Sequence, residues 1–318
     1  MKIIRGSRNI REEIKNPVLT LGNFDGVHVG HQTIFKNVIL RSKEIDGTSV
    51  VFTFEPHPLK IVAPDRCPPL LTSFHKKMEL IQEAGIDMVI CADFNKRFAD
   101  QHPREFAENI LYKRIEVKEI FVGYDYTFGR GREGTIAYLK KMGNEFGFKV
   151  NVVDPVKIDR NLVSSSLIRD LIEDGKVEQA SLFLGRAYSI KGKIIDGYKK
   201  GKVIGYPTAN IDIHHELIPH TGVYGVKVIY KELSYDGIVN VGFNPTFNRD
   251  SLSVEAHIFD FNKDIYGKEI EISFIGRIRE EIAFNSAQEL VEQIGLDIER
   301  AKDILKRHSM QRCQEKGE

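Results

Sequence analysis

Hydrophobic side chains in the first half of the chain fall into two alternating patterns. Short apolar runs predict strands that are buried on both faces: Val18–Leu21, Ser49–Phe54, Asp87–Ala92, Glu119–Val122 and Lys149–Val153. Segments with helical spacing separate them, including Thr33–Ile45, a helix that ends at Gly85, Pro103–Arg114 and Thr135–Phe146. Strands that alternate with helices indicate a parallel sheet with both faces covered, so we expect a doubly wound, Rossmann-like domain.

After about Leu184 the pattern changes to strand-like runs joined by turns: Tyr188–Ile195, Val223–Tyr230, Gly237–Val241, Ser253–Phe261 and Lys268–Phe274. No helix-length pattern lies between them, which predicts a small antiparallel barrel or sandwich. One helix follows, and Ser286 with Glu289 has the spacing of a capping box at its start. We expect domains over residues 1–184 and 185–307, then a polar tail over 308–318.

Composition excludes several classes of protein. The chain has 318 residues, of which 42% are hydrophobic, so it is not intrinsically disordered. Its 46 basic and 45 acidic side chains give a net charge of +1, which argues against a protein that coats nucleic acid or an anionic membrane. We find no membrane span, no signal peptide and only three scattered cysteines, and therefore expect a soluble cytoplasmic protein.

The segment Gly22–His31, GNFDGVHVGH, follows a predicted strand and opens a predicted helix. A parallel sheet binds ligands at this edge, and the N-terminus of the helix offers free amide donors to an anion. His28 and His31 can both point at one phosphate and stabilise its charge in a transition state. A capping loop with incidental histidines is the alternative, but the strand–loop–helix setting favours a phosphate site.

A second candidate anion site is Val163–Arg169, VSSSLIR, which also starts a helix. One serine is enough to cap a helix, so three hydroxyls and Arg169 indicate a phosphate site rather than a cap alone.

Two other motifs of the first half are weaker. Gly129–Gly134, GRGREG, fits a dinucleotide fingerprint but does not directly follow a strand, so a mobile loop is the better interpretation. Phe54–Pro58, FEPHP, is interpreted as a stiff turn rather than a site.

The second half offers oxygen ligands for a metal ion. Thr208 and Asn210, in GYPTAN, alternate with Ala209, so both side chains of an extended segment face one side. A hydroxyl and an amide oxygen suit Mg²⁺ shared with nucleotide phosphates, whereas an ordinary edge turn is the alternative. Glu255, in SVEAHIFDF, is either a base or a solvated carboxylate, and composition does not decide between them.

Together these motifs carry a resemblance. GNFDGVHVGH, FEPHP, GYDYTFGRGREG, VSSSLIR, GYKKGKVIGYPTAN, IVNVGFNPTF, VEAHIFDF and DIYGKEIEISFIGRIR occur in this order. The series resembles the bacterial bifunctional riboflavin kinase/FAD synthetases over about residues 1 to 307. The resemblance implies an N-terminal FMN adenylyltransferase domain of the nucleotidyltransferase type and a C-terminal riboflavin kinase on a six-stranded barrel. It also implies Mg²⁺ as cofactor, with ATP, riboflavin and FMN as substrates.

The resemblance further implies a role for each matched residue. His28 and His31 would stabilise adenylyl transfer, Glu255 would be the base for the ribityl hydroxyl of riboflavin, and Asp125 would lie on the flavin side of the first site. Thr208 and Asn210 would hold Mg²⁺. The positions implied for ATP and its phosphates are Gly22, Asn23, Phe24, Ser164, Ser165, Arg169, Lys202 and Thr208.

Departures from the family pattern are few. Lys202 stands where arginine is common, and Ser166 where threonine is usual, and Ala187 replaces a proline. Lysine lacks the fork of arginine, so Lys202 is expected to loosen nucleotide binding. Two alternatives stay open: a chain in which only the kinase works and the first domain has another adenylyl acceptor, and a flavin-binding regulator that contacts RNA. We expect small-molecule partners, no nucleic acid or membrane, and a monomer or weak homo-oligomer.

Overall fold

The computed structural model describes residues 1–11, 13–195, 205–213, 217–243 and 252–315, with side chains up to 310. The chain divides into two compact units, Met1–Ser165 and Ser166–Glu318. From the sequence we predicted the boundary between residues 184 and 185, which is about two helices further along the chain than this division. The two positions differ because α7 (Ser165–Glu173), apart from its first residue, and α8 (Val177–Leu184) group with the second unit.

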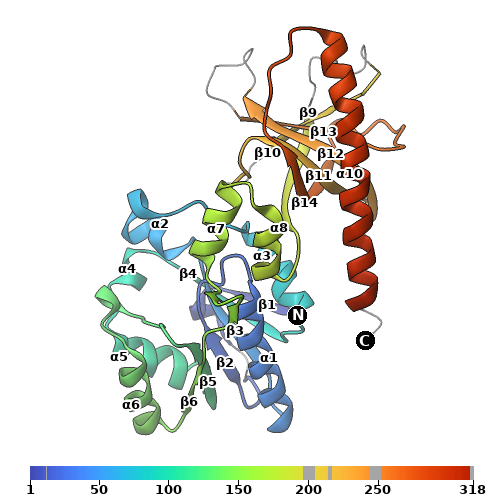
Figure 1. Ribbon diagram of the computed structural model, residues 1–318. Coiled ribbons are helices and arrows are strands. Elements are labelled where there is room, and N and C mark those ends of the chain that lie inside the picture. Colours follow the sequence, from blue (N-terminus) through green and yellow to red (C-terminus); the bar gives the residue numbers. More distant parts are fainter. Residues whose placement is uncertain (12, 196–204, 214–216, 244–251, 316–318) are drawn as a thin grey trace. The chain divides into compact units, whose positions relative to one another are not determined.

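The first unit is built on a parallel six-stranded sheet with the order β1-β4-β3-β2-β5-β6 (Figure 1). The strands are β1 (Lys2–Arg5), β4 (Met88–Asp93), β3 (Ser49–Glu55), β2 (Val18–Leu21), β5 (Glu119–Gly123) and β6 (Lys149–Val153). All residues of β2 are buried, as expected of a central strand covered on both faces. Because every pairing is parallel, the carboxyl ends of all six strands meet at one edge.

Helices cover both faces of this sheet, each over its own apolar core. One core joins α1 (Val29–Glu44) and α3 (Phe74–Glu83) to the sheet. The other lies under α5 (Pro103–Phe106), the π-helix Ala107–Tyr112 and α6 (Ile136–Phe146). The remaining short elements of this unit are α2 (Pro58–Val62), α4 (Lys96–Ala99), β7 (Lys157–Ile158) and β8 (Asn161–Leu162), with single 3-10 turns at Ser7–Asn9, Pro64–Arg66 and Arg130–Arg132.

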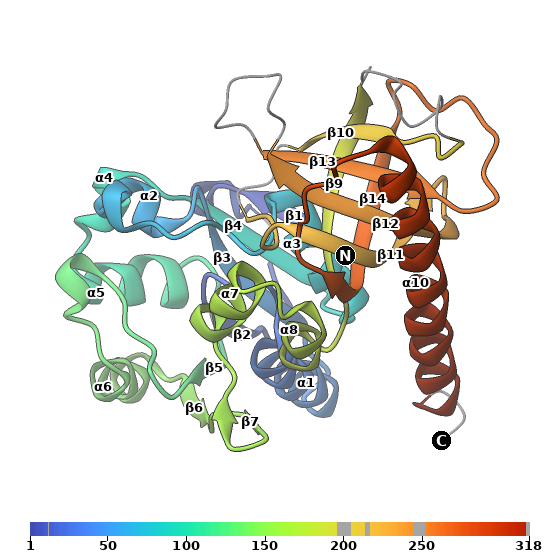
Figure 2. The ribbon, with the colours of Figure 1, turned by 45° about the horizontal axis from the view of Figure 1, so that its top comes forward.

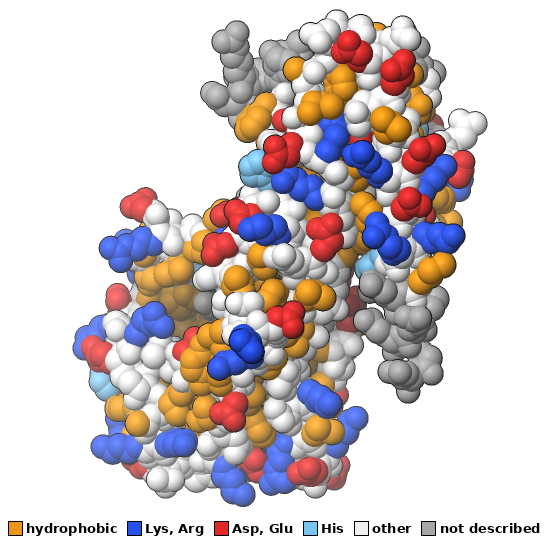
Figure 3. Space-filling model, in the orientation of Figure 1, with side chains coloured by type: hydrophobic (Ala, Val, Ile, Leu, Met, Phe, Trp, Pro, Cys, Tyr) orange, Lys and Arg blue, Asp and Glu red, His pale blue; other side chains and the backbone are white. Residues whose placement is uncertain are grey.

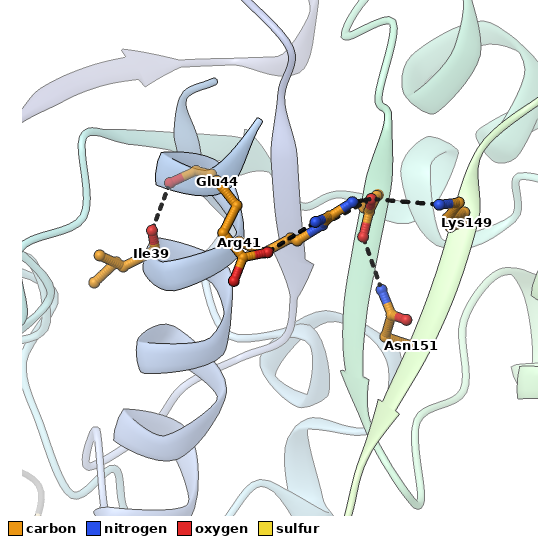
Figure 4. A network of polar contacts seen from close by, with 7 residues as sticks. Ile39, Arg41, Glu44, Lys149 and Asn151 are labelled. Carbon is orange, nitrogen blue, oxygen red and sulfur yellow. Dashed lines mark hydrogen bonds and ion pairs between the residues drawn. The ribbon is translucent and has the colours of Figure 1, made fainter. Parts of the chain in front are cut away.

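A buried polar network closes the opposite, amino-terminal edge of the sheet (Figure 4). Arg41, near the end of α1, donates from Nε and Nη2 to Oε1 of Glu119 at 2.9 and 2.7 Å. Asn151 on β6 donates to the other oxygen of the Glu119 carboxylate at 3.4 Å. Glu119 is only 7% exposed, so this network ties α1, β5 and β6 together far from the carboxyl edge.

The barrel of the second unit closes in the order β10-β13-β12-β11-β14-β9, and its pairings are antiparallel. Its strands are β9 (Tyr188–Ile195), β10 (Ala209–Ile213), β11 (Gly222–Tyr230), β12 (Leu233–Phe243), β13 (Leu252–Ile258) and β14 (Glu269–Arg279). Inward residues alternate with outward ones: Val254, Ala256 and Ile258 of β13 are buried, whereas Glu255 and His257 are half-buried.

The long helix α10 (Ala287–Glu315) lies along the outside of this barrel (Figure 2). Its apolar side, which includes Ile294, Ile298 and Leu305, packs against Val223, Ile238 and Ile275 of the strands. Arg279 on β14 forms a forked ion pair with the buried carboxylate of Asp297, with contacts between 2.8 and 3.1 Å. No described helix of either unit is long and apolar enough to cross a membrane.

The predicted fold class is confirmed in both halves. The amide of Glu289 donates to Oγ of Ser286 at 3.2 Å, so the helix start predicted from the capping box is also correct. Four strands were not predicted: β1, β10 and the two-residue strands β7 and β8. The helix α10 continues through Glu315, where we expected only a polar tail.

Candidate active sites

The loop between β2 and α1 lies at the carboxyl edge of the sheet and has an unusual backbone. Phe24 and Val27 adopt positive φ angles of 52° and 41°, which side chains other than glycine rarely do. A Cβ on Gly22 would lie 2.8 Å from the ring of Phe24, so only glycine lets that ring fold back under the loop. Such strain persists only where the surroundings hold it in place.

Asp25 is one of the groups that hold this loop. Its carboxylate is 7% exposed and accepts from the amides of Leu71 and Thr72 at 3.0 and 3.1 Å, and from the Thr72 hydroxyl at 3.3 Å. The amide of Gly26 donates back to that hydroxyl at 3.1 Å. The carboxylate is therefore occupied with fixing the loop. Asp25 is in the motif from which we predicted a phosphate site, but we assigned no role to it from the sequence.

The two histidines lie together at the start of α1. His28 is the N-cap, and its Nδ1 accepts from the amide of His31 at 3.3 Å. Because Nδ1 accepts, a neutral His28 carries its proton on Nε2, from which it can donate to an anion. The two rings are stacked with centroids 3.5 Å apart, and the edge of Phe24 packs against His31 at 5.2 Å. The two rings therefore lie together at the start of α1, and the predicted role of both in binding one phosphate stays a prediction.

The serine motif joins the same loop. The hydroxyl of Ser165, the first residue of α7, donates to the carbonyl of Asp25 at 3.0 Å, across 140 positions of sequence. Ser164 precedes it and is half-buried, whereas Ser166 is exposed. Arg169 lies one helical turn after Ser165 and is buried. The beginning of the serine motif is thus held at the loop of His28 and His31 by Ser165, within the first unit.

The loop after β5 supplies the next group at the carboxyl edge. Asp125 is exposed, and its Oδ1 lies 3.4 Å from where a Cβ of Gly123 would be, so it folds back over the end of the strand. Beyond it, the backbones of Phe128 and Gly134 pair and close a short turn. The segment Gly129–Gly134 is thus separated from β5 by Tyr124–Phe128 and forms a turn of its own, whereas the glycines of a dinucleotide fingerprint directly follow a strand.

The motif that we interpreted as a stiff turn starts a helix. Nδ1 of His57, the N-cap of α2, accepts from the amide of Leu59 at 3.2 Å. The sequence missed a different residue at this edge, the buried Lys77 of α3. Its signal was a charge on an apolar stripe, because Phe74, Met78 and Ile81 share that side of the helix.

The second site lies on the outer face of the barrel. Glu255 on β13 is the register partner of Asn210 on β10 and of Asn240 on β12. Directly opposite side chains have Cβ atoms about 5 Å apart, so both amides flank the carboxylate. Thr208 is exposed just before β10. Lys202 lies outside the described residues.

Oxygen donors dominate this second arrangement. The hydroxyl of Thr208, the amide of Asn210 and the carboxylate of Glu255 are hard ligands of the kind that Mg²⁺ prefers. Within the ranges that the structure describes, there is no group of three or more His, Cys, Asp and Glu that could hold a metal ion. Mg²⁺ commonly uses one or two protein ligands plus substrate phosphates, so this donor set fits it.

Comparisons with known proteins match both units. Residues 10–167 match the FAD synthetase family model, and residues 184–305 match the riboflavin kinase model. Two relatives named bifunctional riboflavin kinase/FMN adenylyltransferase come from Buchnera aphidicola subsp. Acyrthosiphon pisum and Bacillus subtilis. The first is 38% identical and covers 94% of this chain and 96% of its own length. The second is 36% identical, and the match covers 92% of this chain and 93% of the relative's length.

A solved structure shares the whole fold. A Streptococcus pneumoniae crystal structure, described as that of a macrolide-efflux protein, has a TM-score of 0.87 and 32% identity. It covers 95% of this chain and 99% of its own. On the matches of both units and the near-complete coverage of the named relatives, the chain belongs to the family of bifunctional riboflavin kinase/FMN adenylyltransferases.

Proposed function

We propose that this chain makes FMN from riboflavin at the barrel and FAD from FMN at the loop that carries His28 and His31. The observation that supports the second assignment most directly is the contact between Ser165 and the Asp25 carbonyl. It holds Ser165 against the loop that carries the two histidines. Family membership supports the two activities, and the contact at Ser165 supports the residues that we propose for the second one.

At the barrel, the terminal ribityl hydroxyl of riboflavin attacks the γ-phosphorus of ATP, and ADP leaves. Glu255 accepts the proton of that hydroxyl, so the new P–O bond forms as the bond to ADP breaks. Thr208 and Asn210 would hold Mg²⁺, and Lys202 would contact the nucleotide. Bound Mg²⁺ would neutralise charge on the phosphates. Because phosphoryl transfer depends chiefly on positioning and charge, one carboxylate base is sufficient protein chemistry here.

At the loop, a phosphate oxygen of FMN attacks the α-phosphorus of ATP, and pyrophosphate leaves. That phosphate is already anionic at neutral pH, so no base is required. What the step requires is donors for the developing charge, which Nε2 of His28 and the ring of His31 provide. Gly22, Asn23 and Phe24 would line the nucleotide, Ser164, Ser165 and Arg169 would hold its β and γ phosphates, and Asp125 would contact the flavin.

The setting of the enzyme is proposed from coarser observations. On the face drawn in Figure 3, acidic and basic side chains are interspersed, which suits small-molecule substrates better than a polyanion. Among the cysteines that the structure describes, neither Cys67 nor Cys91 is in a disulfide, which supports a reducing compartment such as the cytoplasm. We propose a monomer or weak homo-oligomer, with the kinase starting near residue 185.

The decisive experiment follows riboflavin, FMN and FAD by chromatography after the full chain is mixed with riboflavin and MgATP. FMN should appear first and FAD after it. Glu255→Ala should abolish FMN formation but leave FAD formation from supplied FMN. The double substitution His28→Ala and His31→Ala should do the reverse and let FMN accumulate. Loss of both activities in either variant would contradict the assignment of two sites, and FAD synthesis by the double variant would contradict the first site.

A further inference from the structure

Lys77 is a buried lysine next to the histidine loop, and neither the family resemblance nor the proposed mechanism uses it. It lies on α3 and is 8% exposed. Its Nζ contacts three oxygen atoms: the carbonyl of Asn23 at 3.3 Å, the hydroxyl of Thr53 at 3.4 Å and the carbonyl of Phe54 at 3.5 Å. Lysine is almost never buried unless its charge has partners. These three oxygen atoms are the partners, and the question is what the buried lysine does for the segments that supply them.

The contacts bridge two segments at the carboxyl edge of the sheet. Asn23 belongs to the loop after β2, whereas Thr53 and Phe54 are near the end of β3. The hydroxyl of Thr53, which is fully buried, itself donates to the Asn23 carbonyl at 3.3 Å. Burial lowers the pKa of Lys77, and the negative charge of Glu55 acts against that shift. The Asn23 carbonyl therefore has two donors in a region that excludes water.

The orientation of that carbonyl controls the position of the histidines. The Asn23 carbonyl belongs to the peptide that precedes Phe24, whose φ of 52° is strained. The ring of Phe24 then packs against His31 at 5.2 Å and against Phe35 at 5.0 Å, and His31 stacks on His28. If the carbonyl lost its donors, the strained peptide would relax, and the ring that supports His31 would move with it.

We propose that Lys77 is a positioning residue for adenylyl transfer, acting through the Asn23 carbonyl and the Phe24 ring on His28 and His31. The inference rests on the proposed function, which places adenylyl transfer at this loop. Lys77 touches no reacting atom. It holds the loop in the one conformation in which both rings are presented together.

The test compares Lys77→Met, Lys77→Arg and the control Lys140→Met in the full chain, where Lys140 is an exposed residue of α6 in the same unit. Lys77→Met should lower kcat for FAD formation about 100-fold, because displacements near 1 Å have this effect on positioned groups. KM for ATP should rise by a smaller factor, about tenfold at most, because Asn23 and Phe24 are proposed to line the nucleotide. Lys77→Arg should recover at least tenfold of that loss, since it restores a buried cation. The control should match the unmodified chain.

Folding is separated from positioning in two ways. Riboflavin kinase activity reports on the other unit, and kcat is expressed per folded molecule from hydrogen exchange at β2, β3 and α3. Thr53→Val provides a second, isosteric variant. It removes the hydrogen bond from the Thr53 hydroxyl to the Asn23 carbonyl and the longer contact of that hydroxyl with Nζ of Lys77, and a loss of kcat of at least about fivefold is expected.

Each outcome decides the matter. Lys77→Met with kcat within threefold of the unmodified chain, or Lys77→Arg no better than Lys77→Met, overturns the proposal. If Lys77→Met fails to fold, an unaltered kcat in Thr53→Val overturns it instead. FAD synthesis by the double histidine variant would contradict the proposed function itself. If the double histidine variant makes no FAD but the Lys77 and Thr53 variants make it at the normal rate, this inference alone is contradicted.

Discussion

Glu119→Gln is expected to loosen the first unit without altering its chemistry. The carboxylate receives two hydrogen bonds from the guanidinium of Arg41, at 2.9 and 2.7 Å, and a third from Asn151 (Figure 4). Hydrogen bonds to charged groups contribute about 1 kcal/mol more than neutral ones. Replacing the carboxylate by an amide makes the two Arg41 bonds neutral on one side, so the free energy of unfolding should fall by about 2 kcal/mol.

The assay is amide hydrogen exchange on the full chain, because two compact units need not unfold in one transition. A loss of about 2 kcal/mol corresponds to about 30-fold faster exchange in α1, β2 and β5. The strands of the barrel should exchange at unchanged rates and serve as the internal reference. Rates of FAD formation should also be unchanged, because Glu119 begins β5 and the histidine loop follows the other end of the neighbouring strand.

Glu44→Gln is the matched control. Glu44 accepts from Nη1 of the same Arg41 at 2.8 Å, but its side chain is 63% exposed. Pairs of this kind are screened by water, so exchange should change by no more than about twofold. Equal effects of the two substitutions, or no effect of Glu119→Gln, would refute the argument that burial makes the Arg41–Glu119 contact strong.

The same contact predicts a pH dependence. The hydrogen bonds from Arg41 hold the pKa of Glu119 below its ordinary value. A group whose pKa is lowered by folding stabilises the native state above its unfolded pKa, about 4.3, and this contribution is lost as the pH falls through the folded value. The free energy of unfolding of the unmodified chain should therefore exceed that of Glu119→Gln by a constant amount from pH 7 to pH 5, and this excess should become smaller below about pH 4.3. If the excess grew as the pH fell, the conclusion that folding lowers the pKa of Glu119 would be contradicted.

Three further outcomes are expected. Burial raises the pKa of the Cys91 thiol to about 11, so alkylation at pH 8 followed by peptide mapping should modify the half-buried Cys67 well before Cys91. Ser165→Ala should slow FAD formation about tenfold, since it removes the hydroxyl that donates to the Asp25 carbonyl in the loop of His28 and His31, and Ser166→Ala, at an exposed position, should not. Asn210→Ala should lower kcat for FMN formation and raise the Mg²⁺ concentration at half-maximal rate, leaving FAD formation from FMN intact; unchanged Mg²⁺ dependence would contradict its proposed role.

Most of the fold could be predicted because, along most of the chain, the spacing of hydrophobic residues in the sequence matches the side chains that are buried in the structure. Strand β9 has the bounds predicted for it, since its alternation is not interrupted. The strand β1 was missed because it has only four residues, two of them charged, which is too short for a recognisable hydrophobic pattern. It is stabilised by its pairing with β4, which the local sequence does not reveal. The segment Pro103–Arg114 was predicted as one helix, but it continues from α5 into a π-helix, and hydrophobic spacing does not distinguish i+4 from i+5 hydrogen bonds.

The candidate sites could be predicted only as far as their chemistry shows in short motifs. His28 and His31 were found because their spacing at a helix start has a direct chemical meaning. Asp25 and Lys77 were not, because their importance depends on partners that are distant in sequence: Asp25 binds the amides of Leu71 and Thr72, and Lys77 binds a carbonyl 54 positions away. No local pattern encodes such a contact.

The two sites also differ in what holds them, and this predicts how each should tolerate change. In the barrel, Glu255 is flanked by Asn210 and Asn240 because strand register fixes which residues are opposite each other. Register survives most single substitutions, so the kinase should lose activity mainly when a functional side chain itself is removed. In the first unit, the histidines depend on a strained loop and on the buried side chains beneath it, so substitutions at residues that touch no substrate should reduce adenylyl transfer.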